Sequence, residues 1–232
     1  MYYFDPTMLL LIPAIIFTFY AQLKVSNAYG TYLRVRNKKG VTGAEAARRI
    51  LDANGYGHIP VEITPGKLSD HYDPKHDVLR LSPDVSNQAS IASVAIAAHE
   101  AGHAIQDQKE YGPLKLRNGI APAIGIVSNL AWPLLIIGIA LNAAGNYTTG
   151  ELLFNLGILF FLGVVIFHLV TLPVEINASN RALTQLVDLG IIYAEEQVGA
   201  KKVLSAAALT YLAALAMAIA NLIRILALRE RD

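Results

Sequence analysis

The chain has 232 residues, of which 54% are hydrophobic and 16% charged, and this apolar composition excludes an ordinary soluble domain and predicts a membrane protein. The net charge of +1, with no basic stripe interleaved with aromatic residues, excludes a nucleic-acid-binding surface. The sequence has no cysteine, so disulfide scaffolds and thiolate zinc sites are excluded, and any metal ion must be held by imidazoles and carboxylates.

Four apolar segments are long enough to cross a bilayer: residues 8–23, 119–141, 152–172 and 203–228. The first nearly spans a hydrocarbon core about 30 Å thick, at about 1.5 Å per helical residue. The residues before it carry no Lys or Arg and include Asp5, and no small-residue cleavage site follows. We therefore expect an uncleaved anchor and not a signal peptide.

The distribution of Lys and Arg predicts the orientation of these segments. Both residue types are absent before the first segment and from residues 142–151, whereas residues 24–117 hold most of them. Because positive residues stay cytoplasmic, residues 24–118 and 173–202 are predicted to be cytosolic and the N-terminus to be outside. Four spans place the C-terminus outside, although Arg224, Arg229 and Arg231 favour the cytosol. The last helix is therefore expected either to cross the membrane or to lie at its interface.

The first cytosolic segment contains both helical and strand signals. Thr42 and Glu45 form a capping box for a helix that is expected to stop near Asn54 and Gly55. A strand is predicted over residues 59–63, followed by a β-hairpin of residues 68–72 and 78–82 that turns at residues 73–76. A second helix is predicted from about residue 87 to residue 108.

This second helix carries the sequence His-Glu-Ala-Gly-His at residues 99–103, an HExxH motif. The i, i+4 spacing puts His99 and His103 on one helix face, where both imidazoles can bind a single metal ion. Glu100 can then reach a water molecule on that ion. Gly102 costs a helix roughly 1 kcal/mol against Ala, which indicates a close backbone neighbour at this position. The motif predicts a zinc site much more strongly than an ordinary polar helix.

A catalytic zinc typically has three protein ligands and a water, so a third ligand is required. An astacin-like continuation is excluded because Gln106 and Lys109 stand where it needs glycine and histidine. Asp107 lies one turn beyond His103, but ligands at i, i+4 and i+8 span about 12 Å of helix axis and cannot bind one ion. Asp107 can at most support the ligands.

Glu175 is the predicted third ligand. After Glu110, the next glutamate is Glu151, which the predicted topology places across the membrane, whereas Glu175 returns to the side of His103 after two spans. Glu175 follows Pro173 at the expected start of a helix, so the alternative is a carboxylate favoured there by the helix dipole. Small residues after Glu175 would allow this helix to approach the HExxH helix closely.

The residues of this candidate site resemble those of a known family. The HExxH stretch 99–106, two membrane spans and then Glu175-x-x-Ala178-Ser179-x-x-Ala182 resemble the YugP-type neutral zinc metallopeptidases. The likeness extends to Phe4-Asp5-Pro6 and to residues 68–74, and so covers nearly the whole chain. It implies zinc and peptidase chemistry. More distantly, the chain is similar to the HtpX and CAAX-processing membrane proteases, which usually carry an aspartate where this chain has Ser179, so a supporting carboxylate has to be sought elsewhere.

The predicted protein is mainly α, a polytopic membrane protein with about four transmembrane helices and a small cytosolic module of helices and a β-hairpin. It is divided into an N-terminal anchor, the cytosolic segment with the hairpin and the HExxH helix, a transmembrane helical hairpin, a cytosolic helix with the third ligand, and a C-terminal transmembrane or interfacial helix. Their ranges are 1–23, 24–118, 119–172, 173–202 and 203–232.

The predicted function is a zinc-dependent metalloendopeptidase in which Glu100 activates a zinc-bound water at the cytosolic face of the plasma membrane. Its predicted substrates are proteins or peptides near the lipid bilayer. His71, Tyr72 and Arg181 are the candidates for stabilising the oxyanion, and the β-hairpin can offer an edge strand to an extended substrate.

Two other functions remain open. One is an intramembrane site-2-type protease, in which a distant Asp-Gly motif would complete the site; residues 187–190 resemble it poorly, and the helix before His99 is too polar to span comfortably. The other is a non-enzymatic membrane module with a structural metal. Among the remaining histidines, His58 and His76 are expected to be solvated and His168 to be packed within the third span.

Overall fold

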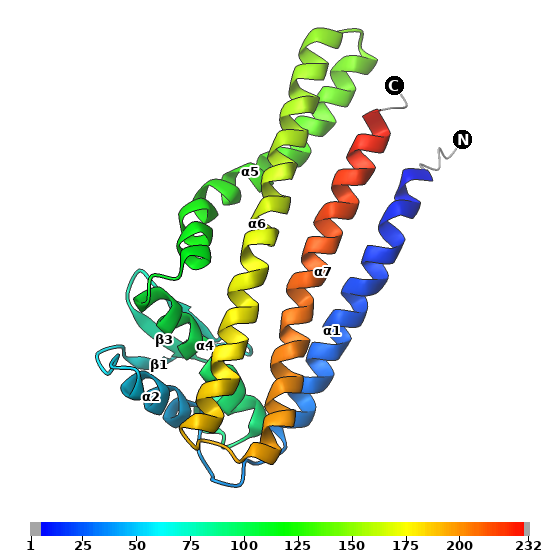
Figure 1. Ribbon diagram of the computed structural model, residues 1–232. Helices are drawn as coiled ribbons and strands as arrows, with labels where there is room; N and C mark the ends of the chain where they lie inside the picture. The colour runs from blue at the N-terminus through cyan, green and yellow to red at the C-terminus, as the bar shows by residue number, and fades with distance from the viewer. Residues whose placement is uncertain (1–5, 230–232) are drawn as a thin grey trace. The chain divides into compact units, whose positions relative to one another are not determined.

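The computed structural model describes residues 6–229 and is mainly helical, with a small three-stranded sheet (Figure 1), as predicted. Phe4, Asp5 and Arg231, which entered the sequence argument, lie outside the described residues. The elements in chain order are η1 Pro6–Leu11, α1 Ile12–Leu33, α2 Gly43–Ala53, β1 Val61–Ile63, β2 His71–Asp73, β3 Val78–Leu81, α3 Pro83–Asn87, α4 Ile91–Gln108, α5 Gly112–Ala143, α6 Tyr147–Asp188, η2 Ala194–Glu196 and α7 Gln197–Arg229.

Four helical stretches are long and apolar enough to cross a membrane: Pro6–Leu33, Gly112–Ala143, Tyr147–Asp188 and Ala194–Arg229. Each contains one of the four segments predicted from the sequence and extends beyond it. Hydropathy detects only the apolar part of a helix, and polar residues such as Lys24 continue the same helix outside that part.

The longest helix, α6, corrects one expectation. The sequence predicted that a separate helix begins near Pro173, but Pro173 lies inside α6, which continues to Asp188. A proline in a helix loses one N–H donor and usually kinks or breaks the helix in water, yet it is tolerated in the helices of membrane proteins. Glu175 is therefore an interior residue of a long helix, and the helix-start explanation of this carboxylate is wrong.

The chain forms two compact units. Among the described residues, one unit comprises 6–20, 116–172 and 211–229, and the other comprises 21–115 and 173–210. In the first unit, glycines allow α5 and α6 to pack closely. A Cβ added at Gly157 would lie 2.7 Å from Cγ of Leu135, and one at Gly138 would lie 2.7 Å from the backbone nitrogen of Phe154.

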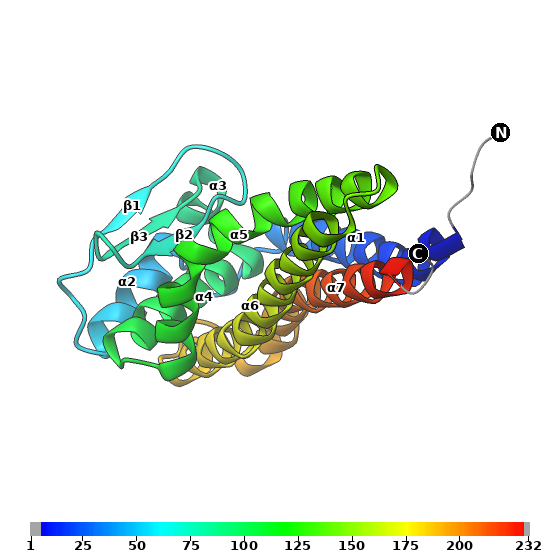
Figure 2. The same ribbon diagram turned by 90° about the horizontal axis from the view of Figure 1, so that it is seen from above.

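The sheet belongs to the second unit and has the strand order β1-β3-β2 (Figure 2). The predicted hairpin is confirmed, with β2 antiparallel to β3 and Tyr72 opposite Leu79. The sequence did not predict that β1 also joins this sheet, in parallel to β3. The backbone N–H of Leu79 points toward β1, where it donates to Pro60 O. Leu79 and Tyr72 are therefore a non-hydrogen-bonded pair of the antiparallel ladder, and the N–H and C=O of Tyr72 point away from β3, to the free edge of β2.

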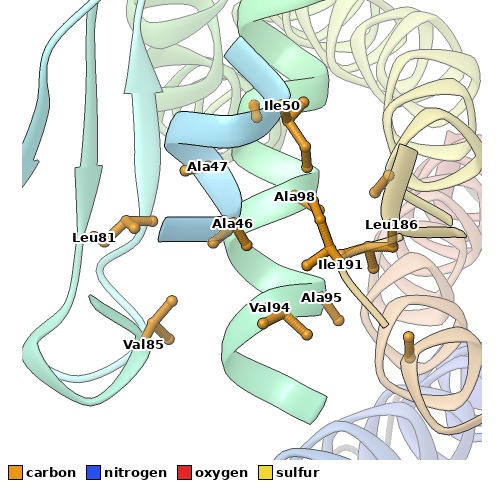
Figure 3. Packing of buried hydrophobic residues seen from close by; sticks show 14 of the residues in the cluster. Ala46, Ala47, Ile50, Leu81, Val85, Val94, Ala95, Ala98, Leu186 and Ile191 are labelled. Atoms are coloured by element: carbon orange, nitrogen blue, oxygen red, sulfur yellow. The ribbon is translucent and has the colours of Figure 1, made fainter. Parts of the chain in front are cut away.

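Helices α2 and α4 pack together beside the sheet and build the core of this unit. Thr42 and Glu45 cap α2 reciprocally, as the capping box predicted, and Asn54 ends the helix. Side chains from α2, α4 and the end of α6 meet in a hydrophobic core around Ile50 and Ala98 (Figure 3). This packing holds α4, the helix with the HExxH motif, against the helix that carries Glu175.

The start of α4 differs from the predicted residue 87. Helix α3 ends at Asn87, and α4 begins only after Ser90, whose hydroxyl accepts from the N–H of Ser93. The intervening residues pair with the end of α1, because Asn37 donates to Ala89 O at 3.0 Å and Ile91 donates to Val35 O at 2.9 Å. Hydrogen bonds to a distant segment thus override the local helix preference.

Candidate metal centre

The structure brings His99, His103 and Glu175 together, although Glu175 comes 72 positions after His103 in the chain. The Nε2 atom of His99 lies 3.2 Å from Glu175 Oε2, and that of His103 lies 3.5 Å from the same oxygen. The two Nε2 atoms are 3.2 Å apart. These distances leave three ligand atoms converging on one point, as expected for residues that share an ion.

The chemistry of this group fits zinc. Two imidazole nitrogens and one carboxylate oxygen form a donor set that catalytic zinc sites use, with one position left for water. Glu175 is only 2% exposed and His103 8% exposed. A buried carboxylate costs free energy unless charges or hydrogen bonds compensate it, and a divalent cation held by these three residues would supply that compensation.

Gly102 explains how α4 and α6 come close enough to share an ion. A Cβ added at Gly102 would lie 2.9 Å from the backbone oxygen of Ala178 and 3.4 Å from its Cα. The close backbone neighbour that the sequence indicated at this glycine is therefore present. The small residues on both helices set the separation between the two histidines and Glu175.

We expect Gly102→Ala to impair the site although alanine favours a helix. The added methyl group has to push α4 and α6 apart, and overpacking of this kind costs typically 1–3 kcal/mol. Zinc affinity, measured by competition with a chelator, should fall and activity should fall with it. The matched control is Gly125→Ala within α5, where a Cβ meets nothing within 4 Å. Unchanged zinc affinity in Gly102→Ala would show that the helix separation is not critical.

The rings of both histidines are oriented by neutral groups, whereas the family comparison led us to seek a carboxylate. His99 Nδ1 lies 3.2 Å from Ser179 Oγ, and His103 Nδ1 lies 3.0 Å from Gln106 Oε1. These contacts leave Nε2 of each ring directed at Glu175. Sequence reasoning missed Gln106, which it considered only as a residue that rules out an astacin-like ligand. The signal was a polar side chain within an apolar helix, three residues after the second histidine of the motif.

Glu100 lies beside His99 and faces the free edge of β2. The backbone N–H of Tyr72 donates to its carboxylate, in agreement with the outward direction of that group in the sheet. Burial raises the pKa of Glu100 to about 7, and the carboxylates of Glu175 and Asp70 act in the same direction. Burial and the two neighbouring carboxylates thus make this carboxyl group easier to protonate than a solvated glutamate.

The three oxyanion candidates have different surroundings. The hydroxyl of Tyr72 lies 2.7 Å from Asp77 Oδ1 and 3.0 Å from Asp107 Oδ2, so its single proton is already used to tie the hairpin to the end of α4. Arg181 Nε donates to Asn177 Oδ1 at 2.7 Å. His71 is exposed on the edge strand and donates from Nδ1 to Ser69 O at 2.8 Å. With Nδ1 donating to Ser69 O, Nε2 of His71 can donate to an oxyanion only when the ring is the imidazolium.

The other candidate residues lie outside the three-residue group. His58 and His76 contact Asp77 and Asp73 near the hairpin turn. His168 lies in the part of α6 that belongs to the other unit. Asp188 is the last residue of α6, where Gly190 with φ +59° follows the helix end. The Asp-Gly resemblance at residues 187–190 is therefore explained as a helix stop.

Two comparisons relate the chain to known proteins. The model of the family described as putative neutral zinc metallopeptidase matches residues 7–230. The chain is also 46% identical over 215 residues to the putative membrane protease YugP of Bacillus subtilis (strain 168), which covers 93% of this chain and 92% of that protein. No solved structure matches the chain significantly.

Proposed function

The chain belongs to the neutral zinc metallopeptidase family, and from this premise we propose that it is a membrane metalloendopeptidase with zinc ligands His99, His103 and Glu175 and the catalytic base Glu100. Family membership makes it a zinc-dependent hydrolase of peptide substrates, and its four apolar helices make it a membrane protein. The observation that supports the site is the convergence of the three ligand atoms within 4.8 Å of one another.

A bound zinc ion lowers the pKa of a water ligand and polarises the carbonyl group of the scissile bond. Glu100 follows His99 directly, so its carboxylate lies next to the ligand group. In the proposed reaction, Glu100 takes a proton from the attacking water and returns it to the leaving amine.

The free edge of β2 is the proposed place where the substrate backbone binds. Tyr72 directs its C=O to this edge, whereas its N–H there donates to the Glu100 carboxylate. An extended peptide can add to such an edge as a further strand, which makes recognition depend mainly on the backbone. His71, on the same strand, and Arg181 are the proposed oxyanion partners, because the hydroxyl proton of Tyr72 is already used. His71 would have to act as the imidazolium, since Nδ1 donates to Ser69 O, whereas Arg181 uses only Nε for Asn177 Oδ1.

Metal removal tests the proposed function. The protein, purified in detergent, is stripped with a high-affinity zinc chelator, and cleavage of an unfolded model protein is followed before and after zinc is restored. We expect activity to disappear with the metal and to return with zinc. Cleavage that persists in the fully stripped protein would contradict the proposal, as would a purified wild type that binds no metal.

We further propose that the protein resides in the plasma membrane with the site facing the cytosol and acts on substrates at or near the bilayer. The proposal rests on the concentration of Lys and Arg in residues 24–117 and their absence from residues 142–151. It keeps the predicted division of the chain, in which 24–118 and 173–202 are the cytosolic segments. An intramembrane site-2-type protease is disfavoured, since α4 is not among the four stretches apolar enough to span.

The sidedness can be measured directly because the chain has no cysteine of its own. Single substitutions Ala144→Cys, between α5 and α6, and Lys75→Cys, in the hairpin turn, introduce one exposed thiol each. A membrane-impermeant maleimide should label Ala144→Cys in intact cells and Lys75→Cys only after permeabilisation. The opposite pattern would place the metal centre on the outer side.

A further inference from the structure

Gln106 is a fully buried amide, with an exposed fraction of 0%. Burial of an amide without hydrogen-bond partners is unfavourable, so the contacts of Gln106 determine whether it is tolerated at this position. Its Oε1 lies 3.0 Å from His103 Nδ1. Its Nε2 lies 2.9 Å from both Val174 O and Asn177 Oδ1.

These contacts fix the direction of the amide and the position of a proton on His103. Val174 O can only accept a hydrogen bond, so the group facing it must be the NH₂ of Gln106. The oxygen of Gln106 therefore faces His103 Nδ1, and Nδ1 must carry the hydrogen. The neutral ring then presents the lone pair of Nε2 toward Glu175, which is the form that binds a metal ion.

The same side chain also connects the two helices that supply the ligands. Gln106 lies on α4 with His103, and its two acceptors lie on α6 on either side of Glu175, at positions 174 and 177. One amide thus holds the His103 ring and the backbone that carries the third ligand. Asn177 Oδ1 accepts in addition from Arg181 Nε at 2.7 Å, so a charged donor fixes the far end of this arrangement.

We propose that Gln106 is the positioning residue of the metal centre, which sets the His103 tautomer and the placement of Glu175 through its bonds to Val174 and Asn177. The inference rests on the proposed zinc ligands. Unlike the carboxylate that often supports a ligand histidine, the amide is uncharged. It orients the ring without adding a further buried carboxylate to those of Glu175 and Glu100.

The first test is Gln106→Met, which keeps the length of the side chain and removes its hydrogen bonds. Loss of a partner that orients a ligand histidine typically costs 10–100-fold in metal affinity. We expect a loss of about this size in the zinc dissociation constant, measured by chelator competition, and a changed visible absorption spectrum of the cobalt-substituted protein. Gln108→Met on the same helix is the matched control, because Gln108 donates to Asp77 and not to a ligand. It should keep the zinc affinity and cobalt spectrum of the wild type.

A second variant, Gln106→Glu, separates orientation from overall stability. Its carboxylate still accepts from His103 Nδ1 but cannot donate to Val174 O or Asn177 Oδ1. We expect zinc affinity closer to the wild type than in Gln106→Met, with kcat reduced and KM little changed. Equal losses of affinity in the two variants, or a wild-type dissociation constant and cobalt spectrum in Gln106→Met, would overturn the inference. A wild type that binds no zinc would contradict the proposed function itself. A wild type that binds zinc, together with an unaffected Gln106→Met variant, would contradict only the inference about Gln106.

Discussion

Replacement of Glu100 by glutamine is expected to abolish most of the peptidase activity while zinc stays bound. Glutamine has the size of glutamate but cannot take a proton from water, and general acid–base catalysis contributes typically 10²–10⁴-fold to a rate. We therefore expect kcat to fall by about this factor. The backbone N–H of Tyr72 that donates to the Glu100 carboxylate can still donate to the amide oxygen, so the local structure should persist.

Zinc content and turnover have to be measured on the same preparations to interpret this variant. Glu110→Gln provides the control, since Glu110 is an exposed residue just beyond α4 that pairs with Lys115 at 2.8 Å. It should keep both zinc and activity. A Glu100→Gln protein with full activity would exclude Glu100 as the base. Loss of zinc together with activity would instead indicate a structural role for Glu100.

The main outline of the protein was predictable because its signals are local. The HExxH spacing depends only on helix geometry, the capping box of Thr42 and Glu45 lies within four residues, and the hairpin of β2 and β3 is a short-range pairing. Membrane topology then restricted the search for a third ligand, because only an acid on the side of His103 could qualify. The structure places Glu175, the residue selected in this way, within 3.5 Å of His103.

What the sequence did not predict depends on contacts between distant segments. Strand β1 has only partly buried or exposed residues, so no alternation of apolar residues marks its parallel pairing with β3. The hydrogen bonds of residues 35–37 with residues 89–91 delay the start of α4. Gln106 and Ser179 acquire their roles only when α4 and α6 lie side by side. Gln106 contacts Val174, 68 positions away in the chain, and Ser179 contacts His99, 80 positions away.

Replacement of Glu175 should have the largest effect on metal binding. Glu175→Ala removes the only anionic member of the group of ligands, and two imidazoles alone hold a catalytic zinc poorly. We expect zinc affinity to fall by more than the 10–100-fold typical of a lost supporting partner, and activity to be lost with it. Glu175→Gln is the second variant, because it keeps the side-chain volume in this buried position and should also lose zinc.

Bound metal, measured by elemental analysis after dialysis, decides the result. Glu151→Ala, at an exposed position near the start of the same helix, is the control and should retain zinc. Full zinc and full activity in both Glu175 variants would mean that the third ligand is another residue, and Asp188 and His168 would then have to be tested in turn. Zinc lost from the Glu175 variants but retained in Glu100→Gln would separate the residue that holds the metal from the residue that moves the proton.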